Sequence, residues 1–442
     1  MLRSLPPPGN PTLTTIPASA ACSAPTSTRA SFSFSFINSM GGSVVTSNAL
    51  YFLTKQGFEF SQAMNFLLGC LLGIVYIAGA LAAKPLLDRL RIHCPSVSTR
   101  GVLSALMFVL AALCFVPQAS ALISPTGKPA AWAIWAVVLL YSPATGMLWP
   151  IVEAYVSGGR SGSHLRSTMG VWNVVWSAAG LFITLVVTPI AERAATLAIA
   201  AIGITHLAAL FPLRGFEPEP GEHIDADHQP HPPVYADLLV TFRLLLPLAY
   251  VVMSAIGPYL PSLAERLGLL KGWSVSGITL TLGGLLPIAW VAARVTTFAA
   301  LARWQAWHGR WSFAIFSGGL MLAGYAGLVF SPLLPRTPGI ALALIGLASF
   351  GAAAAAIYTA AIYYAMEVGK ADVNAGGRHE ALIGVGYTLG PGIGLASTLA
   401  VERGWVPPAA FEPLMLGTVG LLALLTAAQV VRTVHKHSRI PA

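Results

Sequence analysis

Charge is scarce in this sequence: lysine, arginine, aspartate and glutamate together make up only 9% of its 442 residues. Soluble domains carry about 25% charged residues, so a surface with so few cannot be facing water. Hydrophobic residues reach 55%, and the mean hydropathy is +0.71. The length also exceeds that of a single soluble core, which stops growing at roughly 250–300 residues. The lipid bilayer is therefore the expected solvent.

Signatures of covalent chemistry are absent as well. The four cysteines lie far apart, which leaves neither a disulfide framework nor a zinc spacing. No phosphate-binding loop, nucleotide fingerprint or GxSxG elbow occurs, and the pair His379–Glu380 lacks the second histidine of a zinc protease. The formal charge of +9 comes from basic residues spread singly between apolar segments. We therefore expect no enzyme, no cofactor, no metal and no nucleic-acid partner.

Long apolar runs dominate what is present. A membrane-spanning helix needs about 20 apolar residues, and the runs are continuous, without the alternation that barrel strands show. They predict an all-α membrane protein. The twelve predicted helices are 32–53, 62–83, 101–123, 131–156, 167–190, 194–213, 236–262, 274–299, 311–334, 338–366, 379–401 and 410–432.

One polar stretch, residues 214–235, divides the helices into two sets of six. We expect a disordered tail over 1–31, a first bundle over 32–213, the linker 214–235, a second bundle over 236–432 and a tail over 433–442. Two nearly equal apolar halves are typical of transporters with internal repeats. The linker histidines, His223, His228 and His231, fit a solvated loop better than a metal site because their spacing is irregular.

Basic residues predict the orientation, because they are enriched in cytoplasmic loops. Most of them fall in loops on the side of the N-terminus, which puts both termini and the linker in the cytoplasm and the protein in the plasma membrane. Arg294 lies near the end of the predicted helix 274–299 and is interpreted as an anchor at that surface. His206, in the middle of a helix, is expected to bond to a neighbouring helix or to titrate near neutral pH.

Over residues 32–432 the arrangement resembles the major facilitator superfamily of transporters. The segment AKPLLDRLR (83–91) is similar to that family's loop signature: Asp88 and Arg89 match, while Lys84 and Arg91 replace glycines. The segment GYTLGPGIGLAS (386–397) resembles the family's Gly-Pro-rich antiporter motif. The resemblance implies the twelve-helix fold, with two pseudo-symmetric bundles around a central cavity.

The resemblance also implies a charge network that gates the cytoplasmic side. Glu153 is expected to form a salt bridge with Arg89 or Arg91; the alternative is a carboxylate that couples to protons. Arg378 and His379 are expected to bridge toward Asp88 and Glu153 when that side is closed. The network comprises Asp88, Arg89, Arg91, Glu153, Arg378 and His379.

A second set of residues lies on helices that line the cavity in that family, or on their neighbours. Asn173 and Trp176 are one turn apart and so face the same way. Arg243 either meets an anionic substrate or extends to the membrane surface. The expected cavity residues are Asn38, Tyr141, Trp149, Asn173, Trp176, Arg243, Tyr250, Tyr358 and Tyr387.

These features predict a secondary active transporter that moves a small molecule by alternating access. Proton-coupled export of a metabolite or amphipathic compound is the leading interpretation, with protons as the coupling ion. Uptake of a sugar or organic anion is the alternative, and a membrane scaffold that has lost transport is a third possibility from another class. The other expected partner is the lipid bilayer, and we expect a monomer.

Overall fold

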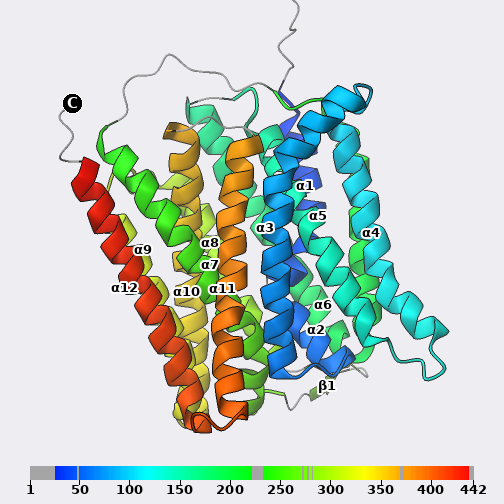
Figure 1. The fold of residues 1–442 in the computed structure, drawn as a ribbon, viewed down its shortest axis with the longest axis vertical. Helices are drawn as coiled ribbons and strands as arrows, with labels where there is room; N and C mark the ends of the chain where they lie inside the picture. Colours follow the sequence, from blue (N-terminus) through cyan, green and yellow to red (C-terminus); the bar gives the residue numbers. More distant parts are fainter. Residues whose placement is uncertain are drawn as a thin grey trace, which may run out of the picture.

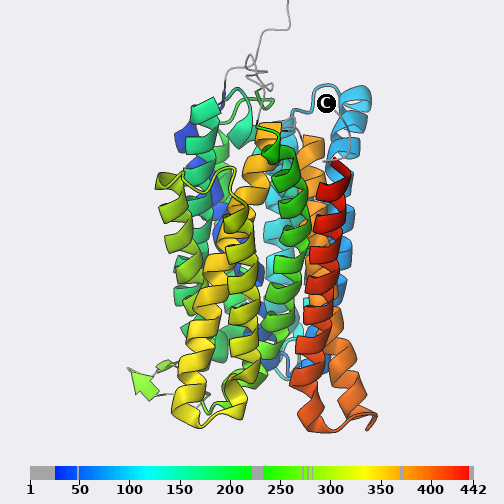
Figure 2. The same cartoon turned by 90° about the vertical axis from the view of Figure 1, so that its left-hand side faces the viewer.

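The structure is a computed structural model of the chain. It describes residues 25–46, 49–160, 162–221, 232–270, 273–275, 278–280, 282–368 and 373–437. Within these ranges the protein is almost entirely helical, with one short two-stranded hairpin (Figure 1). The long helices run side by side in both views, and α12 ends at the opposite end of the molecule from the hairpin (Figure 2).

The first bundle contains the helices that precede the linker. They are α1 (Thr28–Thr46), α2 (Ala49–Gly57), α3 (Gln62–His93), α4 (Thr99–Ile123), α5 (Ala131–Ser157) and α6 (Gly162–Leu213). Serines start two of them: Ser61 accepts a hydrogen bond from the Met64 amide at α3, and Ser98 accepts one from Gly101 at α4. Such caps satisfy amides that have no partner within the helix.

Helix α6 consists of two antiparallel arms. An added Cβ on Gly180 would lie 2.8 Å from Ser43 Oγ, and one on Gly41 would lie 2.6 Å from His206 Nε2. Residues 180 and 206 therefore both meet the same turn of α1, although a straight helix would separate them by about 39 Å. The chain reverses between the apolar spans His164–Val187 and Ala195–Leu213, which correspond to the predicted helices 167–190 and 194–213.

The second bundle follows the linker. Its helices are α7 (Val234–Arg266), α8 (Leu282–Arg303), α9 (Trp311–Phe330), α10 (Arg336–Val368), α11 (Val373–Glu402) and α12 (Phe411–His437), with 3-10 turns η1 (Ser331–Leu333) and η2 (Pro408–Ala410). Gly268 and Gly404 follow α7 and α11 with φ of 66° and 69°. Glycine adopts this left-handed conformation without strain, so it ends a helix readily.

Ten helical segments of the described chain are long and apolar enough to cross a membrane. With α8, and with α1 and α2 as the first span, they make up the expected two sets of six. Large apolar side chains also point away from the core: Phe108, Phe211, Ile315 and Leu424 are 57–76% exposed. Exposure of this kind suits lipid, so the chain is an integral membrane protein with the predicted all-α fold.

The start of the eighth span differs from the prediction. Residues 274–280 were predicted as helix, but β1 (Trp273–Val275) and β2 (Ile278–Leu280) pair antiparallel, and α8 begins only at Leu282. The stretch is rich in β-branched residues, which favour strands. Helix α8 also ends later than predicted, at Arg303, so Arg294 lies in the middle of α8 and not near its end.

The boundaries of the tails and linker also differ. Helix α1 begins at Thr28, inside the predicted tail, and Thr26 is buried. Helix α12 continues to His437, past the predicted end at 432. The start of the linker is docked on the first bundle: Phe216 is buried, and Tyr155 Oη donates to the Glu217 carbonyl at 3.0 Å. The three linker histidines lie outside the described residues.

Two seams join the bundles. In the first seam, α3 and α5 pack against α11; an added Cβ on Gly73 would lie only 2.4 Å from the Thr388 amide nitrogen. In the second seam, α6 packs against α8, where the rings of Trp176 and Phe298 lie 5.5 Å apart. Small residues allow such close approach inside a membrane. We call the end of the bundles that carries residues 214–221 the linker end, and the opposite end the hairpin end.

Candidate functional site

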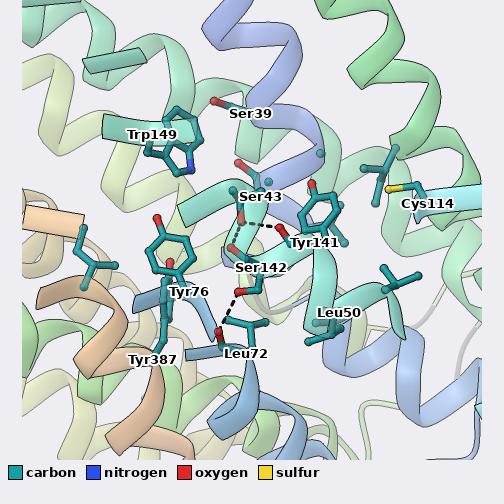
Figure 3. A pocket seen from close by; sticks show the side chains of 18 of the residues that line it. Ser39, Ser43, Leu50, Leu72, Tyr76, Cys114, Tyr141, Ser142, Trp149 and Tyr387 are labelled. Atoms are coloured by element: carbon teal, nitrogen blue, oxygen red, sulfur yellow. Dashed lines mark hydrogen bonds between the residues drawn. The ribbon is translucent and has the colours of Figure 1, made fainter. Parts of the chain in front are cut away.

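A central cavity lies between the two bundles. It encloses about 1090 Å³ of space not occupied by protein atoms, part of it open to solvent. Figure 3 shows Trp149, Tyr76, Tyr387 and Tyr141 around it. Both bundles contribute, and Glu380 of α11 is the one acidic or basic side chain among the lining residues of this cavity. Apolar walls with few polar groups are typical of small-molecule sites.

Most of the expected cavity residues lie in this wall. Two come from α5, one from α6, and one each from α7, α10 and α11: Tyr141, Trp149, Trp176, Tyr250, Tyr358 and Tyr387. Rings contact one another across the bundle boundary: Tyr358 of α10 lies 5.6 Å from Trp176 of α6, and Tyr387 of α11 lies 5.5 Å from Tyr76 of α3. The aromatic wall thus connects the two bundles.

Three expected cavity residues lie elsewhere. Asn38 is buried beside the cavity and bonds to His206. Asn173 accepts a hydrogen bond from Trp176 Nε1 at 3.1 Å and lines a separate pocket near the linker end. Arg243 is exposed on α7 and is absent from the cavity wall, so it does not lie where the cavity prediction put it. It lies near the start of α7, where a long side chain can reach the membrane surface.

His206 is held by two neighbouring helices. Its Nδ1 lies 3.1 Å from Asn38 Oδ1 of α1, and its Nε2 lies 2.8 Å from Tyr141 Oη of α5. A neutral ring that donates from Nδ1 to Asn38 accepts from Tyr141 at Nε2, which satisfies both nitrogens. The bond to neighbouring helices is the outcome that the sequence favoured for this histidine.

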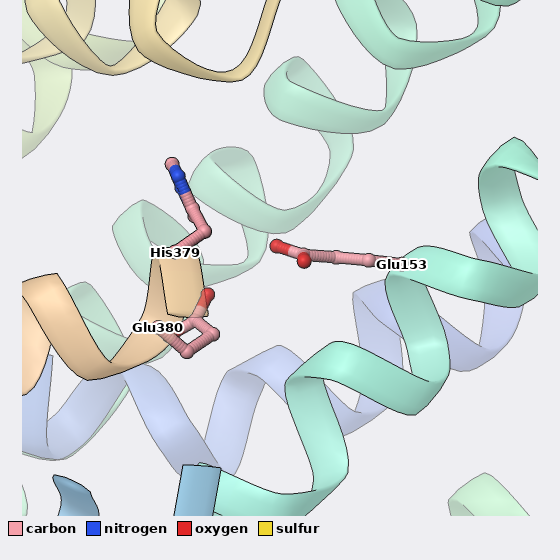
Figure 4. Close-up of side chains that lie close together, drawn as sticks. All are labelled: Glu153, His379 and Glu380. Atoms are coloured by element: carbon pink, nitrogen blue, oxygen red, sulfur yellow. The ribbon is translucent and has the colours of Figure 1, made fainter. Parts of the chain in front are cut away.

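Two buried carboxyl groups meet in the first seam. Glu153 of α5 and Glu380 of α11 are 3% and 4% exposed, and their carboxyl groups approach each other within 4.8 Å. Figure 4 shows Glu153 reaching from α5 toward Glu380 and His379. Tyr76 Oη of α3 donates a further hydrogen bond to Glu380. Two carboxylates in contact repel each other strongly away from water, so at least one of them holds a proton.

His379 completes this cluster. One ligand atom each from Glu153, His379 and Glu380 lie within 4.8 Å of one another, a spacing that could hold a metal ion. The His379 ring also lies 5.6 Å from the ring of Tyr358 in the cavity wall. The absence of a metal therefore stays a prediction, and the buried cluster differs from the exposed network that the sequence indicated.

The other members of the expected charge network lie apart from Glu153. Asp88 pairs with Lys84 on the same helix, and Arg91 pairs with Glu219 of the linker at 2.8 Å. Arg89 is exposed. Glu153 thus has an acid as its partner in this structure, and neither predicted arginine contacts it. Pairs exposed to this extent contribute about 0–1 kcal/mol.

Arg378 is also exposed and makes no bridge to Asp88 or Glu153 among the described residues, although its neighbour His379 does face Glu153. At the linker end, Glu219 interacts with α3 and α4 and not with the predicted gating network. Partial burial raises its pKa, but hydrogen bonds from Thr99 and Arg91 outweigh this, and the net pKa is lowered. The charges at the linker end therefore dock the linker.

Arg294 is the functional candidate that the sequence analysis placed wrongly. It lies in the middle of α8, is 5% exposed, and donates from Nε to Ser177 Oγ of α6 at 2.9 Å. Its guanidinium lies between two indole rings, 4.7 Å from the centroid of Trp176 and 4.6 Å from that of Trp290. The surface-anchor interpretation is wrong because α8 continues to Arg303, past the predicted end at 299, so Arg294 lies more than two turns from that end.

The partners of Arg294 do not balance its charge. No described acidic side chain forms an ion pair with it, and its Nη2 has no hydrogen-bond partner among the described residues. Desolvating a charge costs several kcal/mol, whereas cation–π contacts return about 2 kcal/mol each when desolvated. Charged groups kept at membrane depth are usually functional. The burial of Arg294 could have been predicted only from the true ends of α8, and no local sequence motif marks them.

Comparison with known proteins supports the fold. No protein-family model matches the sequence, and no curated protein matches it. The human organic anion transporter MFSD10 (TETRAN) is similar in structure, with a TM-score of 0.56, 15% identity, and 91% of this chain and 99% of that chain covered. The nucleoside transporter NupG has a TM-score of 0.58, 14% identity, and 91% and 98% covered. The chain therefore has the fold of major facilitator superfamily transporters.

Proposed function

We propose that this protein is a proton-coupled secondary transporter that moves a small amphipathic molecule by alternating access. The observation that carries the proposal is the carboxyl pair of Glu153 and Glu380, which links the two bundles at the wall of the cavity. Proton coupling needs a site whose protonation changes as the bundles move. A pair that spans the bundle boundary is such a site.

The coupling follows from electrostatics. While the first seam is closed, the two carboxyl groups share a proton because both cannot be ionised in contact. When the bundles separate, water reaches the pair and the cost of ionisation falls. Because Glu380 also lines the cavity, a molecule bound there meets the same group. A proton is therefore exchanged once in each conformational cycle.

The cavity supports a substrate with an apolar or aromatic body. Trp149, Trp176, Tyr250 and Tyr358 offer ring faces, and hydroxyl groups such as that of Ser43 offer hydrogen bonds. The names of the similar structures, an organic anion transporter and a nucleoside transporter, also describe small organic substrates. We propose that transport is export across the plasma membrane, with the linker end on its cytoplasmic side. We also propose that the protein works as a monomer.

The test is proton movement in proteoliposomes that hold a pH-sensitive dye. Adding substrate candidates from a panel of aromatic and amphipathic compounds should move protons with the wild-type protein. E380Q should abolish this movement while binding persists. E402Q is the matched control, because Glu402 lies exposed on the same helix, and it should behave as wild type.

Three results would contradict the proposal. Proton movement that persists in E380Q would remove the pair from the coupling step. Substrate movement without any proton flux in the wild type would favour an uncoupled permease, and no flux of any compound would favour the scaffold alternative.

A further inference from the structure

A small pocket opens beside the central cavity, in the second seam. It is lined by Arg294 and Trp290 of α8, and it shares Trp176, Tyr250 and Tyr358 with the cavity wall. The pocket therefore adjoins the space in which we expect the substrate to bind.

Two buried donors on this pocket lack an acceptor. Arg294 Nη2 and Trp290 Nε1 have no hydrogen-bond partner among the described residues, and both side chains are at least nine-tenths buried. Buried donors are paired in the great majority of proteins, and each exception asks for an explanation. A pocket with unpaired donors and a fixed positive charge is complementary to an anion.

The guanidinium also approaches the cavity itself. A Cβ added to Gly180 of α6 would lie 3.3 Å from Arg294 Nη2 and 2.8 Å from Ser43 Oγ. Ser43 lines the cavity, so the free edge of the guanidinium and a cavity hydroxyl meet at one small glycine. A group that enters from the cavity can accept hydrogen bonds from both.

We propose that Arg294, Trp290 and Ser43 bind the anionic group of the transported molecule, such as a carboxylate, sulfonate or phosphate, while the aromatic wall holds its apolar body. The inference rests on the proposed function, since it names the substrate class of that site. Arginine suits this role because its planar fork pairs with such groups in a bidentate manner. Neutral and cationic analogues of the same shape should bind poorly, because they leave the buried charge unbalanced.

The test is a thermal-shift titration of the purified full-length protein with probes matched in shape and different in charge. Benzoate, benzenesulfonate and phenyl phosphate are compared with benzamide and benzylamine, since a ligand that binds the folded state raises the melting temperature. The anions should stabilise the wild type, and the neutral and cationic probes should not. R294Q should weaken anion binding about ten- to hundredfold. R303Q, at an exposed position of the same helix, should leave it unchanged.

W290F keeps a six-membered aromatic ring but removes the five-membered ring that carries the unpaired N–H. It should weaken anion binding about two- to tenfold, and it tests the proposal if R294Q does not fold. Equal stabilisation by benzamide, anion binding that survives R294Q unchanged, or no stabilisation of the wild type by any of the three anions would overturn the proposal. The assay involves no proton gradient. The carboxyl pair can therefore fail as a coupling site while this test succeeds, and the reverse also holds.

Discussion

The first seam buries the two carboxyl groups of Glu153 and Glu380, whereas the second seam buries the guanidinium of Arg294. Each seam contains a close glycine contact, Gly73 with Thr388 in the first and Gly170 with Ala302 in the second, yet the charges of the two seams are balanced in different ways. A proton shared between two acids leaves the pair with one negative charge in place of two. Arginine stays protonated at neutral pH and can be balanced only by an anion. In the two proposals, the coupling proton belongs to the first seam and the charge of the substrate to the second.

After E380Q, the largest effect on the first seam should come from E153Q. Glutamine keeps the size of Glu153 and can still hydrogen-bond Glu380, but it cannot exchange a proton. Turnover in proteoliposomes should therefore fall by about tenfold or more, a barrier change of about 1.4 kcal/mol, while substrate affinity stays nearly constant. If affinity collapses and the rate of conformational exchange is unchanged, Glu153 contacts the substrate and the assignment is wrong.

R294M sharpens the comparison in the second seam. Removing a buried charge that lacks a counter-ion relieves a desolvation cost, so without ligand the variant should be as stable as the wild type or up to about 3 kcal/mol more stable. Thermal unfolding in detergent measures this. A loss of more than about 2 kcal/mol would mean that the two indole contacts of Arg294 hold the seam together and that its role is structural.

His308, near the linker end of the second seam, gives a pH-dependent effect. Burial and the nearby Arg166 lower its pKa to about 4, and its ring stacks on Tyr363 with centroids 4.4 Å apart. The folded protein thus favours the neutral ring. This stabilisation is complete above pH 6.5 and is lost as the pH falls toward 4; because the ring is half-exposed and screened by solvent, the loss should be about 1 kcal/mol. H308N should reduce the dependence of the melting temperature on pH over that range. If H308N has the same pH dependence as the wild type, His308 is not the group that causes it.

The smallest effect should come from the exposed charges at the linker end. D88N breaks a pair with Lys84 whose side chains are 47% and 35% exposed. Pairs of this kind contribute about 0–1 kcal/mol, so melting temperature and transport should change little. A transport defect as large as that of E153Q would show that the predicted exposed network does gate the protein in another conformation.

The fold could be predicted because bilayer spans must be long and apolar, and the sequence has little else. The predicted helices failed mainly where an apolar run was not helical. In the run that precedes α8, strands form over residues 273–275 and 278–280. Hydropathy cannot distinguish a strand from a helix in a short apolar run. It also misplaces helix ends: the predicted helix stopped at 299, whereas α8 continues to Arg303, so Arg294 was placed nearer the membrane surface than it is.

The partners of the buried acids could not be predicted for a related reason. Glu380 stood at the start of the predicted helix 379–401, whereas α11 begins at Val373 and carries it two turns into the bundle. Its contact with Glu153 joins residues more than two hundred positions apart. The aromatic wall was easier to predict, because Tyr141, Trp149 and Tyr387 lie well inside long helices whose order in the fold was anticipated.

Distances between spin labels test the central claim most directly. One pair replaces the exposed Arg89 and Arg378 near the linker end, one residue in each bundle; the other replaces the exposed Lys128 and Arg403 near the hairpin end. In a variant without native cysteines, lowering the pH should change the two distances in opposite directions, and E380Q should abolish the response. Distances that stay fixed, or that respond equally in E380Q, would contradict alternating access driven by the carboxyl pair.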